Sequence, residues 1–181
     1  MTRYKDDELV GIFQRVEQCY YADLRLEQLK PAFFNHSLPM HQRFTVNKVS
    51  HYYSMSFFVH LSELFRFFKD DAELNKRLKT APKQRLEFRK RIRDVAAKSH
   101  DFSEVRTKLI PYVNSMKSSG INWRSEFVTL LEYFKELLTE RGEKAGPFFY
   151  YQSLRGLQAY VLANPPNLNY PMPDLKKDLL K

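Results

Sequence analysis

Residues 51–68 read HYYSMSFFVHLSELFRFF, and this stretch decides the fold class. Its apolar side chains recur at helical spacing and cover a wide part of the helix surface. We therefore expect a central helix from about residue 45 to residue 69. The stretch is broken by His60, Ser62, Glu63 and Arg66, which is typical of a buried helix and not of a membrane span. The broad apolar face comprises Val49, Tyr52, Tyr53, Phe57, Leu61, Leu64, Phe65 and Phe68.

Five further segments show helical periodicity, and capping residues, prolines and turns mark their limits. Pro31 is expected to end the first helix, and Pro111 to kink the fourth. Ser103 and Asn122 are expected to cap helix N-termini, and Asp70 and Asp71 a short helical extension through Leu78. These segments cover residues 6–29, 82–99, 103–118, 123–140 and 148–162. The sequence thus predicts an all-α, single-domain bundle of five to six helices over residues 1–163, and a Pro-rich, extended C-terminal tail over residues 164–181.

Composition narrows the class of protein. The chain has 181 residues, 43% of them hydrophobic, which argues against global disorder. Cys19 is the only cysteine, so the chain contains neither an intrachain disulfide nor a cysteine cluster for zinc. The first residues lack the apolar run of a signal peptide. Together these features favour a cytoplasmic protein without a membrane segment.

Positive charge is concentrated in one segment. Residues 76–98 hold ten Lys or Arg against two acids, Glu87 and Asp94, a net charge of +8 in a chain whose total is +9. Such a segment favours RNA or another polyanion as a partner. The alternative is a solvated helix face with no partner. The expected nucleic-acid-binding residues are Lys76, Arg77, Lys79, Lys83, Arg85, Arg89, Lys90 and Arg91.

Arg93 and His100 close this segment. They are seven residues apart, so on one helix they share a face. We expect them beside the buried stripe of Phe88, Ile92, Val95 and Ser99. An arginine can bind two phosphate oxygens, and a histidine can move a proton near neutral pH. The pair is therefore a candidate site for RNA phosphodiester chemistry. The alternative is that His100 stabilises a helix C-terminus and Arg93 is an ordinary surface cation.

The stretch RIRDVAAKSHDFSEV, with Arg93, Asp94 and His100, resembles the motif of the HEPN family. The long aromatic helix before it and the segment INWRSEFVTLLEYFKELL after it also resemble that family's layout, over about residues 45–140. The resemblance implies a metal-independent ribonuclease or toxin-type domain. Arg93, His100 and Asp94 would be catalytic, with His100 as base or acid, Arg93 on the phosphate and Asp94 orienting either.

The same resemblance implies a homodimer with the site in the cleft between two protomers, and an antitoxin or other protein as a partner. Adjacent aromatic residues such as Phe57-Phe58 also favour helices buried on two sides, as in a dimer. The other four histidines show no convincing metal-ligand spacing, so neither a metal nor another cofactor is expected. Two alternatives remain open: a non-catalytic helical module that binds nucleic acid, and a helical protein-interaction module.

Overall fold

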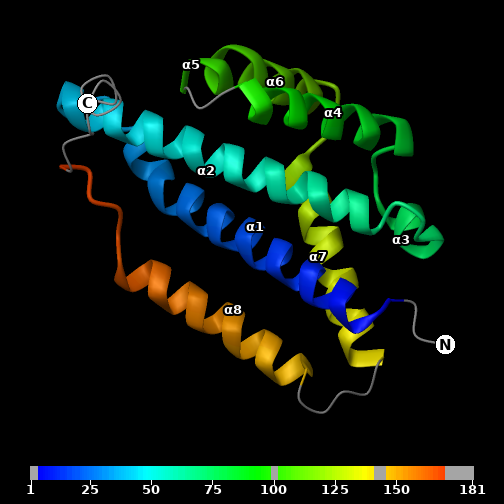
Figure 1. The fold of residues 1–181 in the computed structure, drawn as a ribbon. Helices are drawn as coiled ribbons and strands as arrows, with labels where there is room; N and C mark the ends of the chain where they lie inside the picture. The colour runs from blue at the N-terminus through cyan, green and yellow to red at the C-terminus, as the bar shows by residue number, and fades with distance from the viewer. Residues whose placement is uncertain (1–3, 99–101, 141–145, 170–181) are drawn as a thin grey trace, which may run out of the picture.

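Two long antiparallel helices form the centre of the molecule (Figure 1). The computed structural model describes residues 4–98, 102–140 and 146–169, with the backbone alone for Lys98, Phe102 and residues 146–151. The central pair is α1 (Asp6–Phe33) and α2 (Met40–Phe67). The other elements are α3 (Ala72–Arg77), α4 (Pro82–Lys98), α5 (Phe102–Glu104), the π-helical turn η1 (Val105–Leu109), α6 (Ile110–Ser118), α7 (Trp123–Glu140) and α8 (Gly146–Ala163).

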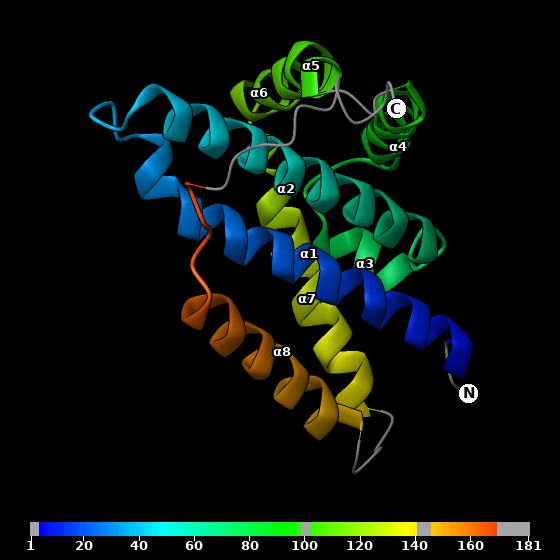
Figure 2. The same cartoon turned by 60° about the vertical axis from the view of Figure 1, so that its left-hand side comes forward.

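The remaining helices cover the central pair from several sides. α4 and the continuous run α5–η1–α6 lie over α2, whereas α8 lies along the far side of α1 and α7 crosses the pair from behind (Figures 1 and 2). Counting that run as one, the described residues form seven helices and no strand. The predicted all-α, single-domain fold is confirmed, with the short α3 as the addition to the six long helices.

Aromatic side chains join α2 to the helices around it. Phe57 packs edge-to-face on Phe127 of α7, with 5.5 Å between the ring centroids. Its neighbour Phe58 packs in the same way on Phe88 of α4, at 5.9 Å. Phe88 in turn stacks on Trp123, the first residue of α7, at 4.1 Å. The Phe57-Phe58 doublet is therefore buried on two sides within a single chain, without a second protomer.

Several predicted helix limits are confirmed, and three are wrong: the end at Pro31, the start of α2 and the cap at Ser103. α4 begins at Pro82, and α7 covers Trp123–Glu140, as predicted. Asn122 caps α7, accepting from the amide of Arg124 at 3.1 Å. However, α1 continues past Pro31 to Phe33. Pro31 removes one amide donor but does not end the helix, and the amide of Phe34 donates to the carbonyls of Lys30 and Ala32 at its C-cap. α2 begins at Met40, five residues before the predicted start, with Pro39 as its N-cap.

The predicted fourth helix contains an irregular turn. Ser103 lies inside the helical run and not at its N-cap, because α5 already begins at Phe102. In η1 the amide of Ile110 donates to the carbonyl of Val105, five residues back. Pro111 follows directly and has no amide hydrogen to donate. A regular α-helix would therefore lack one backbone hydrogen bond here, and the wider π-helical turn lies at the same place. The run ends at Ser118, and Gly120, whose φ is +84°, follows in the turn that leads to α7.

Burial of α1 places the only cysteine out of reach of solvent. Cys19 is fully buried against α2, and its thiol donates to the carbonyl of Phe57 over 3.5 Å. Burial raises the pKa of this thiol well above its usual range. Within the described ranges, no helix combines the length and the apolar character needed to cross a membrane.

Candidate nucleic-acid interface

A buried carboxylate fixes the start of α4. Glu126 of α7 is 1% exposed, and it accepts from the amides of Lys79 and Thr80 at 3.1 and 3.4 Å. It also accepts from the Thr80 hydroxyl at 2.8 Å. Four residues after Ala81, the guanidinium of Arg85 folds back and donates to the Thr80 carbonyl and the Asn75 side chain. The chain entering α4 is thus held by α7 on one side and by α3 on the other.

Arg85 belongs to the interior and not to the surface. It is 6% exposed, and burial lowers the pKa of its guanidinium while the nearby charge of Glu126 acts in the opposite direction. The sequence carried a signal for this position. Arg85 precedes Phe88 and Ile92 by three and seven residues, which places it on the buried stripe of the helix. We therefore no longer count Arg85 among the residues available to a nucleic acid.

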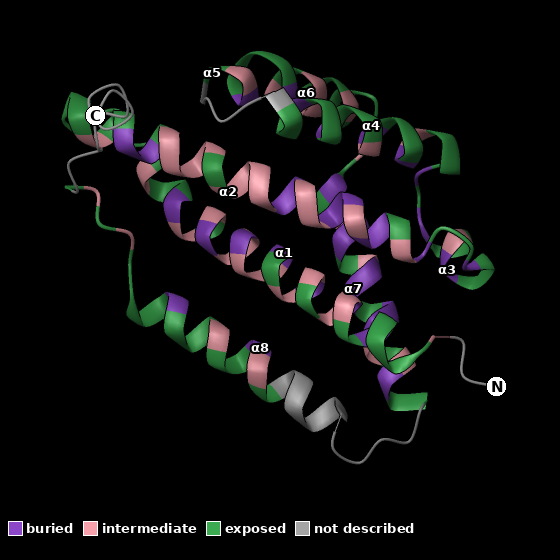
Figure 3. Cartoon of the chain, viewed as in Figure 1, coloured by how far each residue is buried: buried purple, intermediate pink, exposed green. Residues whose placement is uncertain are grey.

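α4 has two sharply different faces. Phe88, Ile92 and Val95 are buried, as the spacing predicted; Ser99, the fourth member of that stripe, lies outside the described residues. The opposite side faces solvent (Figure 3). By helical geometry, four cations fall within an arc of roughly 120° on that side. We call them the α4 basic face: Lys83, Arg89, Lys90 and Arg93.

The α4 basic face is open to a partner. Lys83, Lys90 and Arg93 are exposed and Arg89 is half-buried, and none of the four makes an ion pair with a described residue. Leu86, 49% exposed, lies among them on the same side. Lys76 and Lys79 are also exposed, just ahead of α4. These cations are therefore available to bind phosphates.

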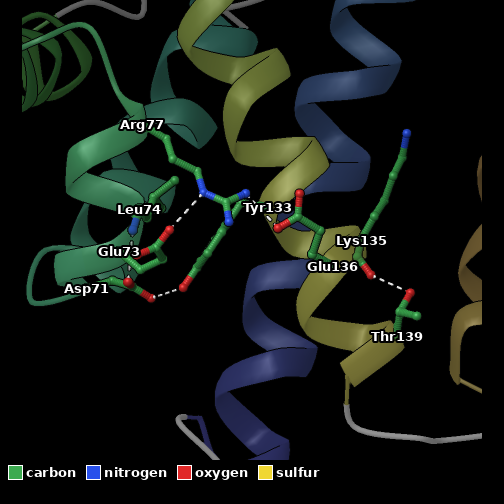
Figure 4. A network of polar contacts seen from close by, with 8 residues as sticks. All are labelled: Asp71, Glu73, Leu74, Arg77, Tyr133, Lys135, Glu136 and Thr139. Atoms are coloured by element: carbon green, nitrogen blue, oxygen red, sulfur yellow. Dashed lines mark hydrogen bonds and ion pairs between the residues drawn. The ribbon is translucent and has the colours of Figure 1, made fainter.

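Two of the predicted binding residues are engaged within the chain. Arg77 donates to Glu73 and Glu136 at 3.3 and 2.6 Å, and its guanidinium lies 5.1 Å from the centre of the Tyr133 ring (Figure 4). The bond to Glu136 raises the pKa of Arg77 further above its ordinary value. Arg91 lies over the ring of Tyr112 on α6, at 5.3 Å. Both remain exposed, but each already has partners that a nucleic acid would have to replace.

Next to Arg77, a buried aspartate ties α3 to the core. Asp71 is 4% exposed and caps α3 by accepting from the Leu74 amide at 3.0 Å, as the sequence indicated. It also accepts from the hydroxyls of Tyr4 and Tyr133, each at 2.6 Å (Figure 4). This carboxylate is fully used in fixing α3, so its role is structural.

The candidate catalytic residues are described only in part. Arg93 and Asp94 are exposed in the last turns of α4, and His100 lies outside the described residues. Arg93 does not border the buried stripe as expected. It follows Phe88 by five residues, which turns it about 140° away from the core side. Whether Arg93 and His100 meet remains a prediction.

The described residues of this interface do not form a metal-binding cluster, and known proteins give no guide to its function. Within the described ranges, no group of three or more His, Cys, Asp or Glu side chains could hold a metal ion. No protein-family model, curated protein or solved structure matches this chain.

Proposed function

We propose that this protein binds RNA through the α4 basic face. The observation that carries the proposal is the set of four cations on one side of one helix, of which Lys83, Lys90 and Arg93 are exposed and Arg89 is half-buried. Phosphate contacts dominate the affinity of proteins for nucleic acids, and a row of unpaired cations on a rigid helix supplies them with little reorganisation. Lys76 and Lys79 extend the positive surface ahead of α4.

The salt dependence of binding tests this proposal. For single strands, each phosphate contact changes the slope of log K against log salt by about 0.7, so four contacts give a slope near 2.8. Raising the salt from about 50 to 200 mM would then weaken binding about 50-fold. Changing all four residues of the α4 basic face to Ala should remove most of this slope, measured by fluorescence anisotropy with a labelled single-stranded RNA.

A matched variant controls for net charge. Arg43, Lys117 and Arg155 are exposed cations on α2, α6 and α8. Changing these three to Ala lowers the net charge by three, as does changing Lys83, Lys90 and Arg93 to Ala, so these two triple variants are the ones compared. The proposal requires that this control keep the wild-type slope. Equal losses in both variants would show that affinity follows the overall charge and would overturn the assignment to α4.

A ribonuclease is the second candidate function. It rests on the resemblance to the HEPN family and is supported by the exposure of Arg93 and Asp94 at the end of α4. In this hypothesis His100 takes the proton of a 2′-hydroxyl and Arg93 stabilises the charge that develops on the phosphate. Two protomers would form the cleft, and an antitoxin or other protein would be the partner.

Cleavage assays separate the two functions. The ribonuclease hypothesis predicts that wild type cleaves cellular RNA in excess EDTA, whereas His100→Ala retains RNA binding and loses cleavage. Arg93→Ala should also lose cleavage, although it removes one cation of the α4 basic face as well. Light scattering after gel filtration would test for the homodimer. RNA binding without cleavage would contradict the ribonuclease hypothesis and favour a non-catalytic module that binds RNA. If RNA is neither bound nor cleaved, the protein-interaction module becomes the better hypothesis.

A further inference from the structure

A pocket with apolar walls and three polar side chains lies beside the first half of α2, and none of its lining residues belongs to the α4 basic face. It is lined by Phe33 at the end of α1, Asn47 and His51 on α2, Arg106 on η1 and Ile110 on α6. Its volume is about 390 Å³. That volume falls within the range of roughly 300–1,000 Å³ that small-molecule sites occupy. None of the five residues belongs to the sites considered above.

Two elements, α2 and η1, bring the polar groups together. Asn47 and His51 are four residues apart on α2, so their side chains share one face. Arg106 reaches the pocket from η1, where the π-helical turn gives the chain an extra residue between the buried Val105 and Pro111. Such turns are rare and are frequent at functional sites. His51 and Arg106 are 55 positions apart in sequence, so no local motif reveals the pair.

The charges in this pocket have one sign. Arg106 is exposed and makes no ion pair with a described residue, and none of the lining residues is an acid. Burial, together with the charge of Arg106, lowers the pKa of His51, so its imidazole is neutral at pH 7. The pocket thus presents one fixed positive charge beside two neutral polar side chains that can both donate and accept hydrogen bonds.

The remaining walls are apolar. Phe33, which is 46% exposed, and Ile110 are the apolar residues that line the pocket. An exposed ring beside a cation and an amide suits a ligand that has a flat ring and an anionic group. An inorganic anion would contact Arg106 alone, whereas a ligand with a ring and an anionic group would contact both Phe33 and Arg106.

We propose that this pocket binds a nucleoside monophosphate unit. Arg106 binds the phosphate, Phe33 stacks on the base, and Asn47 and His51 bind the polar edge of the base or ribose. The unit can come from a free mononucleotide or from an RNA strand, since both present the same phosphate, sugar and base. The proposal does not depend on the α4 basic face, and it adds a ligand site that RNA binding through α4 does not require.

Isothermal titration of the full chain with the four nucleoside 5′-monophosphates tests the site, alongside adenosine and inorganic phosphate. At least one monophosphate should bind ten or more times tighter than adenosine or phosphate alone. Arg106→Ala should weaken that binding at least tenfold, because a charge-assisted bond to phosphate is lost. Asn47→Ala and Phe33→Ala should each weaken it several-fold, with circular dichroism confirming that every variant is folded.

Lys108 provides the matched control. It lies on the same turn as Arg106, but it pairs with Glu104 at 2.7 Å and does not line the pocket. Lys108→Ala should leave nucleotide binding unchanged. If no monophosphate binds, the same variants are tested with a short single-stranded RNA; a loss in Arg106→Ala but not in Lys108→Ala identifies the strand as the source. Equal behaviour of the two variants with both ligands overturns the proposal.

Discussion

Changing Glu126 to Ala should destabilise the protein more than any loss of surface charge. The carboxylate is 1% exposed and accepts three hydrogen bonds from Lys79 and Thr80. Its removal leaves two backbone amides and one hydroxyl without an acceptor. Each buried group left unpaired costs about 1–3 kcal/mol, and the hydroxyl can rotate toward another acceptor. We therefore expect the free energy of unfolding to fall by about 3–5 kcal/mol, a large share of a typical total.

Urea unfolding followed by circular dichroism measures this loss, and two variants bracket it. Glu126→Gln keeps one oxygen acceptor but turns an amide donor toward the same region, so an intermediate loss is expected. Glu132→Ala removes an exposed carboxylate from the same helix, where it pairs with Lys135, and should cost about 1 kcal/mol or less. A loss below about 1 kcal/mol for Glu126→Ala would refute the reasoning that this carboxylate holds the entrance to α4.

Three further predictions concern stability. Phe88→Ala, which removes a fully buried ring stacked on Trp123, should cost about 3–5 kcal/mol in chemical unfolding. Asn122→Ala, which removes the cap of α7, should cost about 1 kcal/mol in the same assay; no change would show that the cap is dispensable. Burial and neighbouring arginines lower the pKa values of His51 and His60, so the unfolded chain binds more protons. The melting temperature should therefore fall as the pH drops below about 6.5, and His51→Gln with His60→Gln should flatten that profile.

The helices with clear amphipathic patterns could be predicted from sequence. The α7 limits follow from an apolar stripe bounded by Asn122, and α4 begins at the proline that marked its first turn. In both helices the residue at the start and the apolar stripe indicate the same helix limits, so packing against the other helices does not shift those limits. The start of α2 was harder to predict, because residues 40–44 show no regular apolar pattern and a proline serves as the cap.

The polar residues of the interior were harder to predict than the helices. Glu126 lies among apolar residues on α7, but its partners come from a loop 46 residues earlier in the chain. Arg85 belongs to a segment so rich in cations that the charge concealed its place on the buried stripe. The π-helical turn has no signal beyond Pro111. The pocket of His51 and Arg106 depends on how α2 and η1 pack, which no short segment encodes.

The burial of Cys19 has a practical consequence for studying this protein in solution. The chain has no other cysteine, and this thiol is both covered by α2 and held protonated. Maleimides and iodoacetamides attack the thiolate, so they should leave the folded chain unlabelled. A cysteine placed at an exposed position of α4 would then be the single reactive thiol. A fluorophore or spin label could be attached there without first replacing Cys19, and without opening a cavity between the two central helices.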